Sequence, residues 1–176
     1  MTQWGSTGSA DGQFLTPESV ASDAAGNIYV LDLYNARVQR FSSGGTFVLA
    51  WGGPGAIDGK FQSPKALAVS ASGFVYVTDA GRIQEFDGTG AFLGHFGDGQ
   101  VQNPTGIAVD GSGFVYVADT GHHRIIKYSS GGTFITQWGS LGSGAGQFQD
   151  AVGVAATSAG FIYVTDRTLH RVQKFE

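Results

Sequence analysis

Residues 113–128 read G-F-V-Y-V-A-D-T-G-H-H-R-I-I-K-Y, and closely similar stretches occur at three other places in the chain. They are residues 26–41 (G-N-I-Y-V-L-D-L-Y-N-A-R-V-Q-R-F), 73–86 (G-F-V-Y-V-T-D-A-G-R-I-Q-E-F) and 160–175 (G-F-I-Y-V-T-D-R-T-L-H-R-V-Q-K-F). In each copy, runs of β-branched and aromatic residues flank a short polar stretch, which predicts two strands joined by a loop. The chain is therefore a repeat protein, and the repeat decides the fold.

The length of the repeat identifies the architecture. The Tyr of the Y-V-x-D motif recurs at Tyr29, Tyr76, Tyr116 and Tyr163, with spacings of 47, 40 and 47 residues. A period of about 40–47 residues with several strands in each unit is typical of β-propeller blades. The 29 glycines and only 4 prolines suit many tight turns between short strands.

Each unit contains four expected strands, except that the last unit contains three. The first strands are expected at 20–22, 67–69, 107–109 and 154–156, and the second at 28–31, 75–78, 115–118 and 162–165. The third are expected at 37–41, 82–86, 124–128 and 171–175, and the fourth at 47–51, 92–96 and 134–138. Short Gly-containing turns between them favour antiparallel hairpins.

The N-terminal segment offers the strand that the last unit lacks. Residues 2–6 (T-Q-W-G-S) are identical to residues 136–140, which begin in the fourth strand of the third unit. We therefore expect an all-β, four-bladed propeller forming one domain over residues 1–176, with the last blade closed by the N-terminal strand. The units are expected at about 14–51, 61–96, 101–138 and 148–176 plus 1–5. Closing the ring would remove an exposed sheet edge.

The composition disfavours or excludes several classes of function. The net charge is −4 and the pI is about 5.4, whereas a nucleic-acid-binding protein needs a basic surface, so nucleic-acid binding is disfavoured. The absence of Cys excludes disulfides and thiolate metal sites. No run of residues has the length of a membrane span, and the N-terminus does not look like a signal peptide. We expect no membrane partner and, by default, a cytoplasmic protein, unless a targeting segment lies outside this sequence.

The repeated motif resembles the NHL repeat. The similarity rests on G-x-hydrophobic-Y-V-x-D, then R-[VI]-x-[KR]-[FY], then W-G and G-x-G-Q-F-x-x-P, and it covers essentially the whole chain. NHL domains are usually six-bladed propellers, so the resemblance implies either a four-bladed ring or chains that associate into larger rings. Members of the NHL family include RNA-binding proteins, lyases and many bacterial domains, and the fold alone therefore implies no chemistry.

Function in such a fold is expected on the face that holds the loops joining second to third strands. These loops carry an Asp and a nearby Arg in every unit: Asp32, Asp79, Asp119 and Asp166, with Arg37, Arg82, Arg124 and Arg171. A ring of carboxylates could bind cations. Because the pair recurs in every unit, a structural bond within each blade is the favoured interpretation. The mouth of the central channel is expected at Glu18, Lys65, Thr105 and Val152.

His122 is the residue that differs most from the repeat. It stands where the first unit has Asn35, whereas His123 and His170 occupy the position before the repeated Arg. An exposed imidazole is a candidate ligand for haem iron or for a divalent transition metal, with His123, His170 and the aromatic Tyr34 as further candidates. A plain surface residue is the competing interpretation.

Two functions follow as hypotheses. The first is a scaffold without catalysis, which binds a protein, a peptide or a small molecule on the loop face. The alternative is a haem- or metal-binding protein with redox or peroxidase-like activity, centred on His122. The sequence contains no nucleophile elbow, phosphate-binding loop or glycosidase pair, so any enzyme activity is expected to be a haem- or metal-dependent oxidoreductase. Association into a homo-oligomer stays open.

Overall fold

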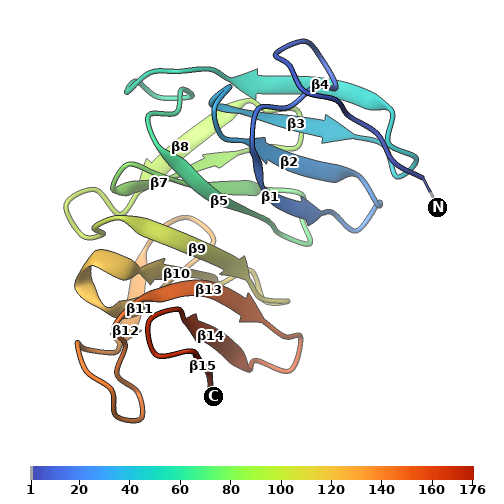
Figure 1. Cartoon of the computed structure of the whole chain (residues 1–176). Coiled ribbons are helices and arrows are strands. Elements are labelled where there is room, and N and C mark those ends of the chain that lie inside the picture. Colours follow the sequence, from blue (N-terminus) through green and yellow to red (C-terminus); the bar gives the residue numbers. More distant parts are fainter. Residues whose placement is uncertain (1) are drawn as a thin grey trace.

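The computed structural model describes residues 2–176 and shows four antiparallel sheets arranged as the blades of a propeller (Figure 1). Blade 1 contains β1 (Pro17–Ser22), β2 (Ile28–Asp32), β3 (Arg37–Phe41) and β4 (Phe47–Gly52). Blade 2 contains β5 (Pro64–Val69), β6 (Val75–Asp79), β7 (Arg82–Phe86) and β8 (Phe92–Phe96).

Blades 3 and 4 follow in the same order. Blade 3 contains β9 (Pro104–Val109), β10 (Val115–Asp119), the 3-10 turn η1 (Thr120–His122), β11 (Arg124–Tyr128) and β12 (Phe134–Trp138). Blade 4 contains β13 (Ala151–Ala156), β14 (Ile162–Asp166) and β15 (Arg171–Phe175). The four-bladed, all-β prediction is confirmed, and the first strands begin about three residues earlier than expected. Within residues 2–176, no helix is long and apolar enough to cross a membrane.

The first strand of each blade lies at the centre of the arrangement. β1 packs beside β5, β5 beside β9, and β9 beside β13. The backbone carbonyl of Val152 lies so close to Gly106 that a side chain on Gly106 would collide with it, whereas a side chain on the equivalent Gly153 would meet only Thr165 of its own blade. The inner strands are therefore packed tightly from blade 1 to blade 4, but not from blade 4 back to blade 1.

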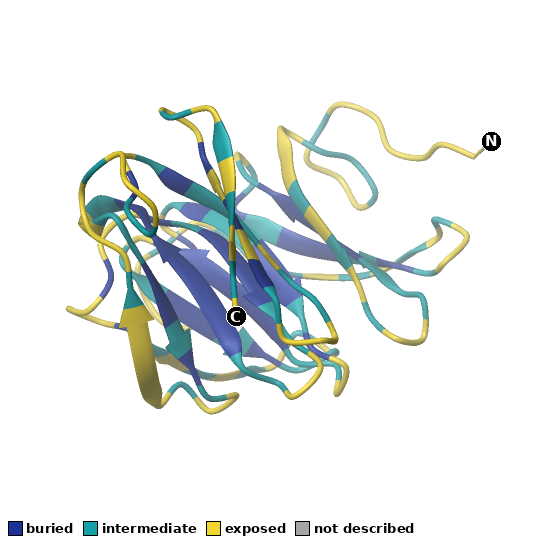
Figure 2. Ribbon diagram, turned by 90° about the horizontal axis from the view of Figure 1, so that it is seen from below, coloured by how far each residue is buried: buried dark blue, intermediate teal, exposed yellow. Residues whose placement is uncertain are grey.

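Three apolar clusters lie between successive blades, and together they form the core. The cluster between blades 1 and 2 includes Tyr29, Leu31 and Val38 on one side and Leu67 and Phe86 on the other. Equivalent residues fill the junctions between blades 2 and 3 and between blades 3 and 4. Figure 2 shows the buried residues along the strands and the exposed residues mainly in the loops. We call the side of a blade that packs on the following blade its trailing face, and the opposite side its leading face.

The predicted closure by the N-terminal strand is wrong. Blade 4 has three strands, and residues 2–6 pair with none of them (Met1 lies outside the described residues). Instead, the ring of Trp4 packs on Phe41 of blade 1, with 6.1 Å between the ring centroids. Trp51 contacts Phe86 of blade 2 at 6.0 Å in the same way. The physical reason is that the Trp at this position makes two contacts, one within its own sheet and one with the next blade. Trp4 makes only the contact with the next blade.

Candidate functional site

One face of the propeller is built from the loops that join second to third strands and from the segments that join consecutive blades. The repeated Asp ties these two kinds of loop together. In blade 1, Asp32 is fully buried and accepts hydrogen bonds from the backbone N–H of Leu15 at 2.7 Å and from Arg37 Nε at 3.0 Å. Arg37 also donates to the carbonyls of Ala10 and Gln13. This shared face, which we call the loop face, is the one that the sequence predicted.

The other three Asp residues are buried in the same way. Asp79 accepts from the backbone N–H groups of Gln62 and Ser63, and Asp166 accepts from those of Gln149, Asp150 and Leu169; the four sites are Asp32, Asp79, Asp119 and Asp166. Burial acts to raise the pKa of Asp166, but these N–H groups and the charge of Arg171 outweigh it and lower that pKa below its usual value. With their oxygens engaged, these carboxylates act as loop anchors.

A glutamine of the third strand anchors the long segment that precedes blades 1, 2 and 4, and it is buried in blades 1 and 2 and half-buried in blade 4. Gln39 accepts from the backbone N–H of Gly12 at 2.9 Å and donates to the carbonyl of Gln13 at 2.7 Å. Gln84 and Gln173 make the same two bonds in blades 2 and 4. In blade 3 the equivalent residue is Ile126, and the segment that precedes this blade, residues 97–103, is shorter. The side chain in the third strand therefore matches the length of the loop that it holds.

His122 replaces an asparagine without changing the hydrogen bond. Its Nδ1 lies 2.9 Å from Oδ2 of Asp119, and Asn35 Nδ2 lies 2.7 Å from Oδ2 of Asp32 in blade 1. Asp119 also accepts from Arg124 Nε at 2.7 Å. One imidazole nitrogen is thus used as a loop anchor, while the side chain stays 44% exposed.

The other candidate ligands have separate environments. His123 Nδ1 lies 2.9 Å from the carbonyl oxygen of Gln149, and both His123 and His170 adopt a left-handed backbone, as Ala36 does in blade 1. Tyr34 extends into solvent beside Leu15, whose carbonyl accepts its backbone N–H at 3.0 Å. Residues 2–176 contain no group of three or more His, Asp or Glu side chains that could hold a metal ion. Haem or metal binding through His122 stays a prediction from the sequence.

The centre of the loop face is a polar cavity of about 450 Å³. All four predicted mouth residues line it: Glu18, Lys65, Thr105 and Val152. The structure adds Asn103 and Arg167, which no repeat pattern had singled out. Arg167 donates from Nε to Asp150 at 2.7 Å, in the blade where Asp150-Ala151 replaces the usual residue-Pro pair.

Sequence reasoning missed two exposed apolar residues on the loop face. Ile57 and Leu141 lie in the long segments between blades, and these residues are 72% and 63% exposed. They belong to irregular segments in which no periodic pattern marks a residue as buried or exposed. The length of these segments, which exceeds that of the turns on the opposite face, was the available signal.

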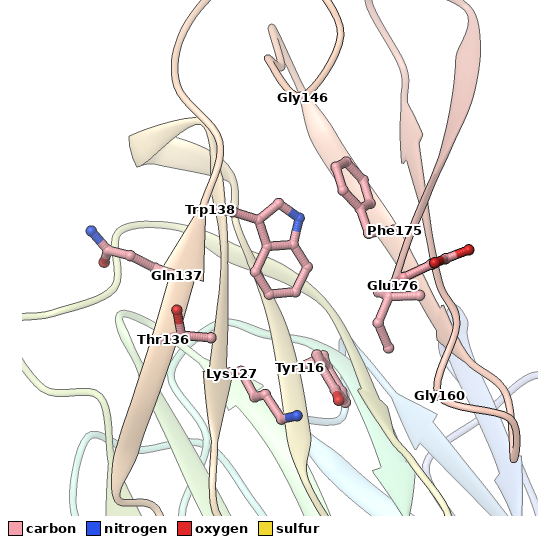
Figure 3. Close-up of a pocket in the computed structure, with 10 residues that line it drawn as sticks. Tyr116, Lys127, Thr136, Gln137, Trp138, Gly146, Gly160, Phe175 and Glu176 are labelled. Carbon is pink, nitrogen blue, oxygen red and sulfur yellow. The ribbon is translucent and has the colours of Figure 1, made fainter.

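A larger groove, of about 510 Å³, lies between blades 3 and 4 (Figure 3). Trp138 of β12 and Phe175 of β15 face it, with Tyr116 and Lys127 at its base. In the other blades, the residue equivalent to Phe175 is paired with an aromatic residue of the fourth strand, as Phe86 is with Phe92. The groove is therefore the space next to the strand that blade 4 lacks, and strand residues form most of its lining, with Gly146 of the loop face at one end.

The chain is similar in structure to longer proteins. It matches Kuenenia stuttgartiensis hydrazine synthase (TM-score 0.71, 14% identity, 91% of this chain and 46% of that chain). It also matches a catalytically inactive virginiamycin B lyase from Staphylococcus aureus with quinupristin (0.70, 12%, 91% and 52%). A third match is the WD40 β-propeller domain of Doa1 (0.64, 15%, 87% and 47%). The chain spans about half the length of each, and at these identities the likeness concerns the fold alone.

Sequence comparison identifies the repeat. No curated protein sequence matches the chain significantly. The family model of the NHL repeat matches residues 14–41, 101–128 and 148–175. These segments fall in blades 1, 3 and 4, and blade 2 has the same strand order and register. The chain is an NHL-repeat β-propeller.

Proposed function

We propose that this protein is a binding scaffold, without catalysis of its own, and that it holds a protein or peptide on its loop face. NHL- and WD40-like propellers are typically protein-binding scaffolds. The observation that carries the proposal for this chain is the placement of its exposed apolar side chains, because solvent-exposed apolar area at a loop face is what a partner would cover.

The large exposed apolar residues fall into three groups. The first lies on the loop face and comprises Leu15, Tyr34, Ile57 and Leu141. The second lies on the outer strands and comprises Val48, Leu93, Phe134 and Ile135. The third lies where blades 1 and 4 have no neighbouring blade, and it comprises Trp4 and Val20 at blade 1 and Tyr163 and Val172 at blade 4. Among the described residues, the short turns opposite the loop face contribute none, so the two faces differ sharply in character.

The loop face combines two kinds of contact. Tyr34, 76% exposed, and its neighbour Leu15 offer an aromatic and an aliphatic surface, and Tyr is a frequent anchor in protein interfaces. The cavity at the centre offers the charged groups of Glu18, Lys65 and Arg167, which can orient a ligand. A polypeptide ligand, which carries both apolar side chains and a polar backbone, fits this combination better than a purely apolar small molecule does.

A peptide-display selection tests the proposal without a known partner. A random peptide library is selected against the wild-type chain, and the enriched peptides are measured against two triple variants. The loop-face variant carries Tyr34→Ser, Ile57→Ser and Leu141→Ser. The matched control carries Val48→Ser, Leu93→Ser and Ile135→Ser on the outer strands.

We expect the loop-face variant to weaken binding by about tenfold or more, since truncating one interface anchor commonly costs more than ~1 kcal/mol. The control should bind as the wild type does. Peptides that bind both variants equally would overturn the proposed site, and a selection that enriches no peptide would overturn the proposed function. Circular dichroism of both variants checks that the fold is retained.

A further inference from the structure

The leading face of blade 1 is uncovered. Val20 of β1 is 67% exposed, whereas its equivalents Leu67 in blade 2 and Ile107 in blade 3 are 4% and 6% exposed. Those two residues are covered by the trailing face of the blade before them. Blade 1 has the same kind of surface, but among residues 2–176 it is covered only in part, by Trp4 and Phe14 against Phe41.

The trailing face of blade 4 is uncovered as well. Val172 of β15 is 62% exposed, whereas its equivalents Val38, Ile83 and Ile125 are completely buried. Tyr163 is likewise exposed, although the Tyr at this position is buried in each of the other blades. The two ends of the arc thus present the two halves of one junction, and the same junction is formed three times inside the chain.

Among the described residues, no strand pairs with the outer edge of β15. The other blades show the register that such a strand would take. Val38 pairs with Trp51, and Ile125 pairs with Trp138. In blade 3 the pairing continues outward from Trp138, with Thr136 opposite Lys127. By the same register, Val172 would stand opposite a Trp, and Lys174 would stand opposite a Thr.

Residues 2–6 already resemble residues 136–140, where the fourth strand of blade 3 ends. Their sequence is identical to that of residues 136–140. Gly5 has φ +93° and packs under the ring of Phe14, just as Gly139, with φ +107°, packs under Phe148. Thr7 also forms an isolated parallel bridge to Phe14, equivalent to the bridge between Leu141 and Phe148. The segment therefore lies on blade 1 as the outer strand of a preceding blade would, although it belongs to no sheet.

We propose that a second copy of this chain completes the junction. The Thr2–Ser6 segment of each copy pairs with β15 of the other, which places Trp4 opposite Val172 and Thr2 opposite Lys174. The trailing face of blade 4 then packs on the leading face of blade 1 of the other copy. This contact is distinct from the loop face, so it goes beyond the proposed binding function.

Two copies suffice because each chain forms about half of a ring. Four blades cover 47% of the WD40 β-propeller domain of Doa1, and two copies supply eight blades, which lies within the usual range of four to eight. A head-to-tail contact repeated twice closes on itself with twofold symmetry, and it gives the edge of β15 a partner over Val172 to Lys174. The two grooves beside Phe175 would remain open, since Thr2 reaches only the level of Lys174.

The mass in solution is the first test. Light scattering of the 176-residue chain is expected to give twice the 18.3 kDa of one chain. Val172→Asp places a charge in the junction and should raise the dissociation constant of the dimer by about a hundredfold, since burying an unpaired charge is costly. The matched control Val48→Asp changes an exposed Val on β4, outside the junction, and should leave the mass unchanged.

Cross-linking tests the register, and the chain has no natural Cys to interfere. Thr2→Cys and Lys174→Cys are made in separate chains, mixed and oxidised. Residues opposite each other on adjacent strands lie within disulfide range, so the mixture should form disulfide-linked dimers of one variant with the other. Thr2→Cys mixed with Lys127→Cys is the control, because Lys127 already pairs with Thr136 and should not link.

Each possible result has a definite meaning. A dimer that links through Thr2→Cys and Lys174→Cys, and that dissociates in Val172→Asp, supports the proposal. A monomer, a filament or another oligomer overturns it, and so does a dimer that forms no such link. A double variant that forms the disulfide within a single chain would show that the chain closes on itself instead.

Discussion

The replacement Asp119→Ala tests whether the repeated carboxylates hold the loops or are available to ligands. Asp119 is fully buried and accepts hydrogen bonds from the backbone N–H of Gln102 at 2.7 Å, from Arg124 Nε at 2.7 Å and from His122 Nδ1 at 2.9 Å. The variant leaves the Gln102 N–H and the largely buried Arg124 side chain without this partner.

The expected loss follows from those contacts. Removing one partner of a buried ion pair costs about 3–5 kcal/mol, because the remaining charge and donors stay desolvated. In a protein of this size, 1 kcal/mol corresponds to a shift of about 2–4 °C in Tm, so Asp119→Ala should lower Tm by roughly 10 °C. Differential scanning calorimetry or thermal circular dichroism measures the shift.

Asp98→Ala is the matched control on the same loop face. Asp98 is 57% exposed in its side chain and lies 3.4 Å from His95 Nε2, an exposed pair worth little to stability. The control should therefore change Tm by no more than about 2 °C, as surface substitutions usually do. If Asp119→Ala melted as close to the wild type as this control, the anchor interpretation would be refuted, and the carboxylates would be free to serve a ligand.

Three further predictions follow from other contacts. His122→Asn should leave Tm within about 2 °C of the wild type, because an amide can make the same bond to the buried carboxylate, whereas His122→Ala should lower it measurably. The free energy of unfolding should fall as the pH drops below about 4, because the depressed pKa of Asp166 stabilises the fold only while this carboxylate is ionised; an acid titration should show a shallower decline in Asp166→Asn. Gly132→Ala should cost about 2–4 kcal/mol by urea denaturation, since φ is +78° and the new Cβ would lie 2.5 Å from Phe96, whereas Gly131→Ala has open space and should be close to neutral.

The blades could be predicted from the sequence because the same strand pattern appears four times. A single copy of residues 113–128 would leave the pairing of its strands open, but the recurrence at 26–41, 73–86 and 160–175 establishes the repeating unit and the order of its strands. The loop face followed from the same pattern, since the repeated Asp always falls at the end of the second strand. These features depend on local sequence, and a repeat makes local sequence easy to interpret.

The position of the N-terminal strand could not be predicted in the same way. An identical sequence at 2–6 and 136–140 indicates the same local structure, and the structure gives Gly5 and Gly139 similar backbones. It does not say which blade provides the sheet, because that depends on the angle accumulated over several blade junctions. Whether β15 and residues 2–6 meet within one chain depends on how all four blades are placed relative to one another. No single sequence motif determines that placement.

The candidate site was predictable in outline, but the contacts of its most unusual residue were not. His122 attracted attention because it breaks the repeat, yet its contact with Asp119 reproduces the one that Asn35 makes with Asp32. His122 is therefore an unusual residue type held by the same hydrogen bond as the Asn of blade 1. The exposed Ile57 and Leu141 were missed, because irregular segments have no period against which an unusual residue can be recognised.

The glutamines that bind these loops have a consequence for protein engineering. Because Gln39, Gln84 and Gln173 each bind the long loop in front of their blade, loop and glutamine form a cassette that can be transplanted together. Extending the short loop 97–103 of blade 3 would require Ile126→Gln in the same design, since a long loop without this partner would leave a buried N–H and a carbonyl unpaired. The third strand of each blade thus specifies the reach of the loop above it, so a new recognition surface can be built by changing one strand residue with each loop.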